Sequence, residues 1–161
     1  MHRGKLNVTT PSDREIAMTR IFDAPQRMVF DAYTKPELLK RWLGVQNGWS
    51  LEVCEIDLRV GGTYRYVWRG PDREEMAMGG VFREIVPYER ISANEKFDVA
   101  WYEGECLETV TFVEQDGKTT LTMTLLYDSK EVRDSVLESP AEGGVAAGFD
   151  TLEDLLAEGL R

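Results

Sequence analysis

The stretch ECLETVTFVEQDGKTTLTMTLLY, residues 105–127, decides the fold. It holds two runs of alternating apolar and polar residues, 105–114 and 118–127, on either side of Asp116-Gly117. Asp-Gly tolerates the positive φ angles that a two-residue hairpin turn requires, so the turn fixes how the two strands pair. The stretch therefore predicts an antiparallel hairpin with a defined register.

That register sorts the side chains of the hairpin onto two faces. The pairs predicted on one face are Phe112 with Leu121, Val110 with Met123, and Glu108 with Leu125. Threonines project from the other face, so the apolar face must be the inner one. A carboxylate, Glu108, thus lies on an otherwise apolar inner face.

The rest of the chain extends this sheet and adds helices. Further strands are predicted at residues 15–22, 51–58, 63–68, 75–86 and 90–96, with two short helices after the first strand. Towards the C-terminus, apolar residues follow a helical spacing of four, three, four and four: Val145, Phe149, Leu152, Leu156 and Leu160. Such a stripe must be covered. We expect an α+β fold in which a curved antiparallel sheet of six to seven strands wraps around a long C-terminal helix.

Size and charge exclude several classes of protein. The chain has 161 residues and a net charge of -10, so its averaged field repels nucleic acid. We expect a flexible segment over residues 1–12 and one domain over residues 13–161. No signal peptide and no membrane span is recognisable, which indicates a cytoplasmic protein. In that compartment Cys54 and Cys106 are expected to be reduced core thiols.

The only histidine is His2, in a terminus that we expect to fray. Most triads, general bases at neutral pH and zinc sites use imidazole. We therefore expect no metal and no cofactor, and we regard catalysis as unsettled but less favoured than binding. Any chemistry would use carboxylates, tyrosines, lysines or an unusual thiol.

An aromatic and methionine patch is the first candidate binding surface. Its members alternate along two neighbouring strands: Tyr64, Tyr66 and Trp68, with Met76, Met78 and Phe82. Such side chains line apolar pockets and adapt to a ligand, but they also fill cores. Trp42 and Trp49, around the loop after the second short helix, would form either the cavity mouth or a staple beneath that loop.

Glu108 indicates a binding site more specifically than the aromatic patch does. We group it with Val110, Met123 and Phe149 as candidate cavity residues. A buried carboxylate must meet a partner, water or a ligand, or else its pKa rises. The alternatives are a position near a strand end that solvent reaches, or a bulge that shifts the register.

Asp57 and Arg59 precede Gly61-Gly62. With a three-residue loop Asp57 would form a cross-strand ion pair with Arg65, whereas a two-residue loop would set it beside Tyr64. We favour the ion pair and a structural role for these residues.

Several motifs spread along the chain are similar to one known family. They are Phe22-Asp23-Ala24-Pro25, Val29-Phe30-Asp31-Ala32, Pro36-Glu37-Leu38 with Arg41-Trp42, Asp57-Leu58-Arg59-Val60-Gly61-Gly62, and the run from Gly80 to Ile91. Together they resemble the activator of Hsp90 ATPase homologue 1-like (AHSA1-type) proteins of the START-like, SRPBCC (Bet v 1-like, helix-grip) superfamily. The family often has Trp-Trp-Gly-Pro where this chain has Trp42-Leu43-Gly44-Val45, and Gly-Trp where it has Gly144-Val145. Both departures lie where members tend to enclose a cavity, so the ligand does not carry over.

The resemblance implies a hydrophobic cavity between sheet and helix. We expect a small-molecule binding protein for a hydrophobic, amphipathic or lipid-like ligand, acting as a monomer or homodimer. One alternative is an enzyme similar to polyketide cyclases or a hydrolase, with Glu108 or a tyrosine as acid or base. Another is an interaction module similar to a co-chaperone. We expect no Hsp90-type partner, because the eponymous proteins carry an additional N-terminal domain for that contact.

Overall fold

The hairpin at residues 106–127 forms as the sequence predicts. In the computed structural model, which describes residues 4–160, Phe112 lies opposite Leu121 and Glu108 opposite Leu125, without a bulge in either strand. Asp116 and Gly117 adopt φ angles of 55° and 78°, the left-handed conformation that a tight hairpin turn needs. The register prediction is confirmed, and Glu108 lies on the inner face.

The hairpin is part of one antiparallel sheet with the strand order β1-β2-β8-β7-β6-β5-β4-β3. The strands are β1 (Asn7–Thr9), β2 (Glu15–Phe22), β3 (Ser50–Ile56), β4 (Thr63–Arg69), β5 (Glu75–Val86), β6 (Arg90–Phe97), β7 (Cys106–Gln115) and β8 (Lys118–Tyr127). The helices are α1 (Gln26–Thr34), α2 (Pro36–Leu39), α3 (Lys130–Leu137) and α4 (Ala141–Ala157).

The described residues form eight strands, one more than the expected six to seven. The additional strand, β1, lies within the segment that we expected to be flexible. It pairs with the edge of β2, with Asn7 opposite Thr19 and Thr9 opposite Ala17. Its central residue, Val8, packs against the core. Three residues are too short to show an alternating pattern, so the sequence carried little signal for this strand.

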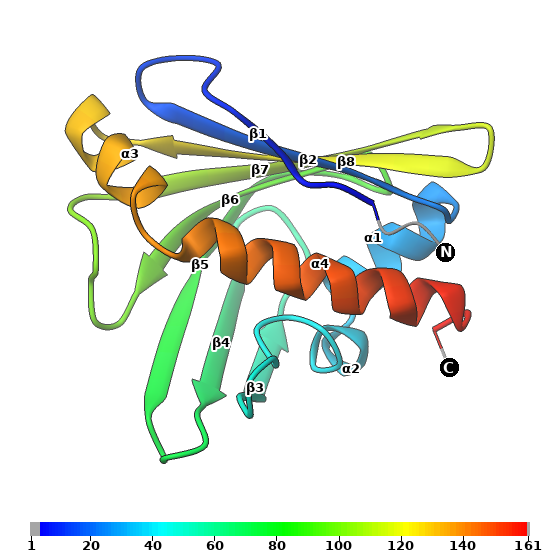
Figure 1. The fold of residues 1–161 in the computed structure, drawn as a ribbon, viewed down its shortest axis with the longest axis horizontal. Coiled ribbons are helices and arrows are strands. Elements are labelled where there is room, and N and C mark those ends of the chain that lie inside the picture. Colours follow the sequence, from blue (N-terminus) through cyan, green and yellow to red (C-terminus); the bar gives the residue numbers. More distant parts are fainter. Residues whose placement is uncertain (1–3, 161) are drawn as a thin grey trace.

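The sheet curves so that β3, β4 and β5 turn away from β1, β2 and β8 and partly surround α4 (Figure 1). Strands β5 and β6 approach each other closely at Gly80. A Cβ at Gly80 would lie only 1.8 Å from the carbonyl oxygen of Asn94, so this position requires glycine. The side-chain oxygen of Asn94 also accepts a hydrogen bond from the Val81 amide.

Helix α4 lies along the concave side of the sheet (Figure 1). Phe149, Leu152 and Leu156 are buried, as the predicted stripe requires, and Leu155 joins them. The helix ends at Ala157, so Leu160, the last residue of that stripe, lies beyond it with a φ of 65°. The sheet and α4 enclose the core, which confirms the α+β architecture.

Candidate functional site

Strand β4 carries three aromatic side chains toward the interior. Tyr64 and Trp68 are buried, whereas Tyr66 between them is only half-buried. The ring centroid of Tyr66 lies 5.0 Å from that of Tyr64 and 5.7 Å from that of Trp68. The Tyr66 hydroxyl has no hydrogen-bond partner within residues 4–160. A polar group without a protein partner among the described residues thus reaches the middle of the inner face.

Glu108 occupies the equivalent central position on β7. It is half-buried, between the buried side chains of Cys106 and Val110 on the same face. No hydrogen bond or ion pair from the described residues reaches its carboxylate. Removal from water, reinforced by the negative charge of Glu95, raises the pKa of Glu108 to about 8. The group is therefore a poorly solvated acid that nothing within the described chain neutralises.

Glu95 supplies a second inner carboxyl group. It lies on β6 opposite Cys106, one diagonal step from Glu108, which is opposite Ala93. Its Oε2 accepts a 2.9 Å hydrogen bond from the hydroxyl of Tyr102. Burial raises the pKa of Glu95, and this hydrogen bond opposes the rise. Two acidic groups thus share one small region of the interior.

Hydroxyl groups surround this carboxyl pair. Burial, followed by the charge of Glu108, raises the pKa of Tyr33 on α1 and of Tyr64 on β4. The pKa of Tyr127 on β8 is raised by burial and then by Cys106. The Tyr33 hydroxyl lies 3.9 Å from the sulfur of Met123, and the Tyr64 hydroxyl donates to the Asn94 carbonyl at 2.9 Å. These tyrosines remain neutral at physiological pH and can donate or accept hydrogen bonds.

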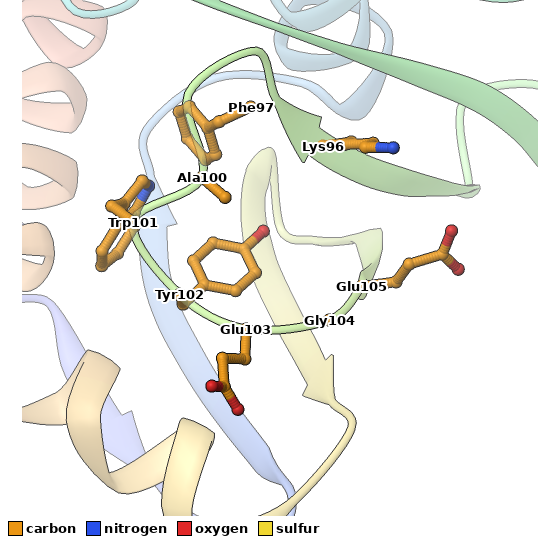
Figure 2. A pocket seen from close by; sticks show the side chains of 8 residues that line it. All are labelled: Lys96, Phe97, Ala100, Trp101, Tyr102, Glu103, Gly104 and Glu105. Atoms are coloured by element: carbon orange, nitrogen blue, oxygen red, sulfur yellow. The ribbon is translucent and has the colours of Figure 1, made fainter.

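A pocket of about 610 Å³ opens at the connection between β6 and β7. It is lined by Lys96, Phe97, Ala100, Trp101, Tyr102, Glu103, Gly104 and Glu105. The rings of Phe97, Trp101 and Tyr102 pack edge to face, and Lys96 points away from them (Figure 2). Because the Tyr102 hydroxyl contacts Glu95, this pocket adjoins the inner carboxyl pair.

Other predicted site residues divide between the core and the edge of the sheet. Trp42 is fully buried; its indole nitrogen donates to the Ala32 carbonyl at 2.9 Å, and its ring packs near Phe149. Trp49 is half-buried against the core. Met76 lies opposite the candidate Trp68, next to the first residue of β5, and is 41% exposed.

The remaining candidates contribute packing to the interior. Phe82, Val110 and Met123 are buried, and Met78 is half-buried. Met78 lies opposite Tyr66, and Val110 opposite Met123. The structure therefore brings Met78 beside Tyr66 and places Val110 directly after Glu108 on the same face.

The prediction for Asp57 is wrong in both of its forms. Arg65 lies opposite Glu55, and Tyr64 opposite Ile56, because the connection from β3 to β4 is longer than either expected loop. Arg65 instead forms an ion pair of 2.7 Å with Asp98. Asp57 pairs with Arg59 at 2.9 Å, and both side chains are exposed. Their role is structural at most.

Sequence reasoning overlooked a buried arginine at the other end of the inner face. Arg20 of β2 is 1% exposed, and its Nη1 lies 2.8 Å from Oδ1 of Asp150 on α4. Its Nη2 lies 3.4 Å from Oε1 of Glu153, which also accepts a hydrogen bond from the Gly4 amide. The sequence did indicate an inward position for Arg20, because it alternates with the apolar residues Met18 and Phe22 along the strand. This cluster joins sheet, helix and N-terminal segment.

Glu95 and Tyr127 were overlooked although the same kind of signal points to them. Glu95 alternates with Ala93 on β6, and Tyr127 continues the inner face of β8 after Leu125. Tyr33 and Tyr102 had no such signal, because one lies on a short helix and the other in a loop.

No group of three or more metal-ligating side chains occurs within residues 4–160. Cys54 and Cys106 are free and buried, and burial raises the pKa of Cys54 to about 11. His2 lies outside the described residues. None of the helices in residues 4–160 combines the length and apolar character needed to cross a membrane.

Comparisons with known proteins agree with this architecture. Residues 23–157 match the family model described as activator of Hsp90 ATPase homolog 1-like protein. A crystal structure of a Rhodobacter sphaeroides protein is 28% identical, covers 96% of this chain and 99% of its own, and superposes with a TM-score of 0.89. A Mycobacterium smegmatis protein is 24% identical, with the same coverage and a TM-score of 0.84.

An AHSA1-like protein from Aeromonas hydrophila is more distant. It is 19% identical, the match covers 91% of this chain and 95% of that one, and the TM-score is 0.72. At this level of identity the likeness concerns the fold alone. A search of curated protein sequences finds no match to the chain.

Proposed function

The chain belongs to the family of activator of Hsp90 ATPase homologue 1-like proteins, and from this premise we propose that it binds a small amphipathic molecule in a hollow between its sheet and α4. The exposure pattern of the inner face supports the hollow. Tyr66, Met78 and Glu108 face the interior, yet each keeps accessible surface, although Tyr64 and Trp68 beside Tyr66 and Cys106 and Val110 beside Glu108 are buried. Side chains that point inward and still contact solvent line a space.

The unpartnered carboxyl group of Glu108 is the observation that carries this proposal. A buried acid without a cation or donor costs free energy in the unliganded protein. A ligand that forms hydrogen bonds or an ion pair with Glu108, and a hydrogen bond with Tyr66, removes this cost. The free energy recovered in this way favours binding. Aromatic walls then desolvate the apolar part of the ligand while these two groups orient its polar end.

Native mass spectrometry of the protein purified from its own host tests this function. We expect a retained small molecule above the mass of the 18.4 kDa polypeptide, and less of it on the Glu108→Gln variant. A single species of polypeptide mass, for protein purified without detergent or organic solvent, would contradict a stable ligand-binding role.

A catalytic role is the second candidate, and the pKa of Glu108 favours it. An acid with a pKa of about 8 is suited to donate or accept a proton near neutral pH. If Glu108 acts in this way, Glu108→Gln abolishes turnover of the retained molecule while the fold persists, and the ligand that still binds stays unconverted. Binding without conversion in the unmodified protein would leave the binding role alone.

A further inference from the structure

We propose that the hollow selects an organic cation, a protonated or quaternary amine attached to an apolar body. The juxtaposition of two inner carboxyl groups, Glu95 and Glu108, with a wall of aromatic rings carries this inference. It rests on the proposed binding function and narrows it to one class of ligand.

Charge balance is the first step of the argument. Within residues 4–160 no cationic side chain forms an ion pair with Glu95 or Glu108. The nearest inner cation along the sheet is Arg20, which is level with Leu121, four residues from the level of Leu125 and Glu108. At roughly 3.3 Å per residue this separation is about 13 Å. Arg20 is already matched by acids on α4, so the interior around Glu108 keeps an excess of acidic groups.

The aromatic rings around Glu108 form the second step. Burial, followed by nearby groups that include Glu108, raises the pKa of Tyr33, Tyr64 and Tyr66, and the ring centroids of Tyr64 and Tyr66 lie 5.0 Å apart. The faces of such rings attract cations, most strongly where water is excluded. An anionic ligand would meet the carboxyl pair and the negative faces of these rings together. Where a carboxyl group of the pair is ionised, the surroundings therefore disfavour fatty acids and favour amines.

The pocket between β6 and β7 provides the third step. Its lining includes Phe97, Trp101 and Tyr102 together with Glu103 and Glu105 (Figure 2). The Tyr102 hydroxyl donates a 2.9 Å hydrogen bond to Glu95. Trp101 is 45% exposed, which leaves an aromatic surface open at this position. The chain has a net charge of -10, which increases the encounter rate of cations over anions.

Protonation of the carboxyl pair makes this selectivity depend on pH. The titratable groups around Glu108 are Tyr33 of α1, Tyr64 and Tyr66 of β4, Glu95 of β6, Cys106 of β7, Tyr102 of the β6–β7 loop and Tyr127 of β8. The tyrosines and Cys106 have raised pKa values and stay neutral, so the charge of the interior changes through the carboxyl groups, and the pKa of Glu108 is about 8. A cation requires an ionised carboxylate, so where Glu108 is protonated the binding of a cation releases that proton to solvent.

Three probes with the same eight-carbon chain test the ligand class. Octyltrimethylammonium keeps its charge at every pH, 1-octanol is neutral, and octanoate is an anion above its pKa. Each is titrated into the full chain below its micelle-forming concentration, and binding is followed by isothermal calorimetry and by amide chemical shifts around Tyr66 and Glu108. We expect the cation to bind roughly tenfold or more tighter than the alcohol at pH 9, and octanoate to bind weakest.

Three variants locate the effect. Glu108→Gln and Glu95→Gln should each remove most of the preference for the cation and flatten its rise in affinity from pH 6 to pH 9. Glu89→Gln changes the net charge equally at an exposed position between β5 and β6 and should leave the preference unchanged. A result from either Glu108→Gln or Glu95→Gln is sufficient for the test. The test therefore stands even if one of these two variants fails to fold.

Each result is decisive. Equal or tighter binding of 1-octanol or octanoate at the same amides would overturn the cation class while leaving the hollow and the proposed function in place. Binding of none of the three probes would contradict both. A cation preference that Glu89→Gln reduces as much as Glu108→Gln does would assign it to the overall charge of the chain and not to the interior pair.

Discussion

Two charged clusters lie on the same inner face of the sheet, and they differ in whether the chain supplies the opposite charge. Arg20 is buried but matched by Asp150 and Glu153 from α4. Glu95 and Glu108 are half-buried, and in residues 4–160 no cation balances them. A charge that is matched inside the chain holds elements together, whereas an unmatched one costs stability unless something else binds it. We assign the first cluster to folding and the second to a ligand.

Replacement of Arg20 should have the largest effect on stability. Arg20→Met removes the buried guanidinium group with its ion pairs to Asp150 and Glu153, and so removes a link between β2 and α4. We expect a loss of about 3 kcal/mol in the free energy of unfolding. Urea denaturation measures this loss. Arg83→Met makes the same change at an exposed position on β5 and should cost little; equal losses for both variants would remove the distinction between the two clusters.

Replacement of Glu108 should instead raise the free energy of unfolding. Because the pKa of Glu108 is about 8 in the folded chain and near 4.5 when unfolded, the folded state binds more protons between these values. Stability conferred by this group therefore falls as pH rises from about 5 to 8, and Glu108→Gln should stabilise the unliganded protein at pH 8 by about 2 kcal/mol. Urea denaturation at pH 5 and pH 8 measures both values; a variant that is less stable at pH 8 contradicts an unmatched carboxylate.

Removal of the Tyr102 hydroxyl should have a smaller effect. Tyr102→Phe deletes the 2.9 Å hydrogen bond to Glu95 and leaves that carboxyl group unsatisfied, so we expect a loss of about 1 kcal/mol at pH 7. The same denaturation experiment measures it. In the double variant with Glu95→Gln the loss should shrink, and an unchanged loss would show that the two groups do not interact.

The exposed ion pair between Asp57 and Arg59 should matter least. Asp57→Asn is expected to change stability by less than about 0.5 kcal/mol, because water screens both side chains. Thermal or urea denaturation in low and high salt checks this value. A loss as large as that of Arg20→Met would show that burial does not rank the charges of this protein.

The sequence predicted the fold well where local chemistry decides it. Asp116-Gly117 set the register of β7 and β8, and this register placed Glu108 inward. The expectation for Asp57 failed, because the β3–β4 connection has no such turn and its length depends on contacts elsewhere. Pairing across elements is also invisible locally, so the match of Arg20 with α4 required the structure.

The candidate site could be predicted only in part for the same reason. Alternation identifies which residues of a strand face inward, and it would have identified Glu95 beside Glu108. It cannot show that Tyr33 from a helix and Tyr102 from a loop complete the surroundings of that pair. Nor can it show that no cation reaches Glu108 from the described residues.

The titration of the Glu108 carboxyl group tests the central claim most directly. Carbon-13 NMR of the unliganded protein, with Glu108→Gln to assign the signal, should give a pKa far above the ordinary range, about 8. Saturation with octyltrimethylammonium should lower that pKa, because the bound cation favours the ionised form. A pKa near 4.5 in the unliganded protein, or one that the cation leaves unchanged, would contradict the account.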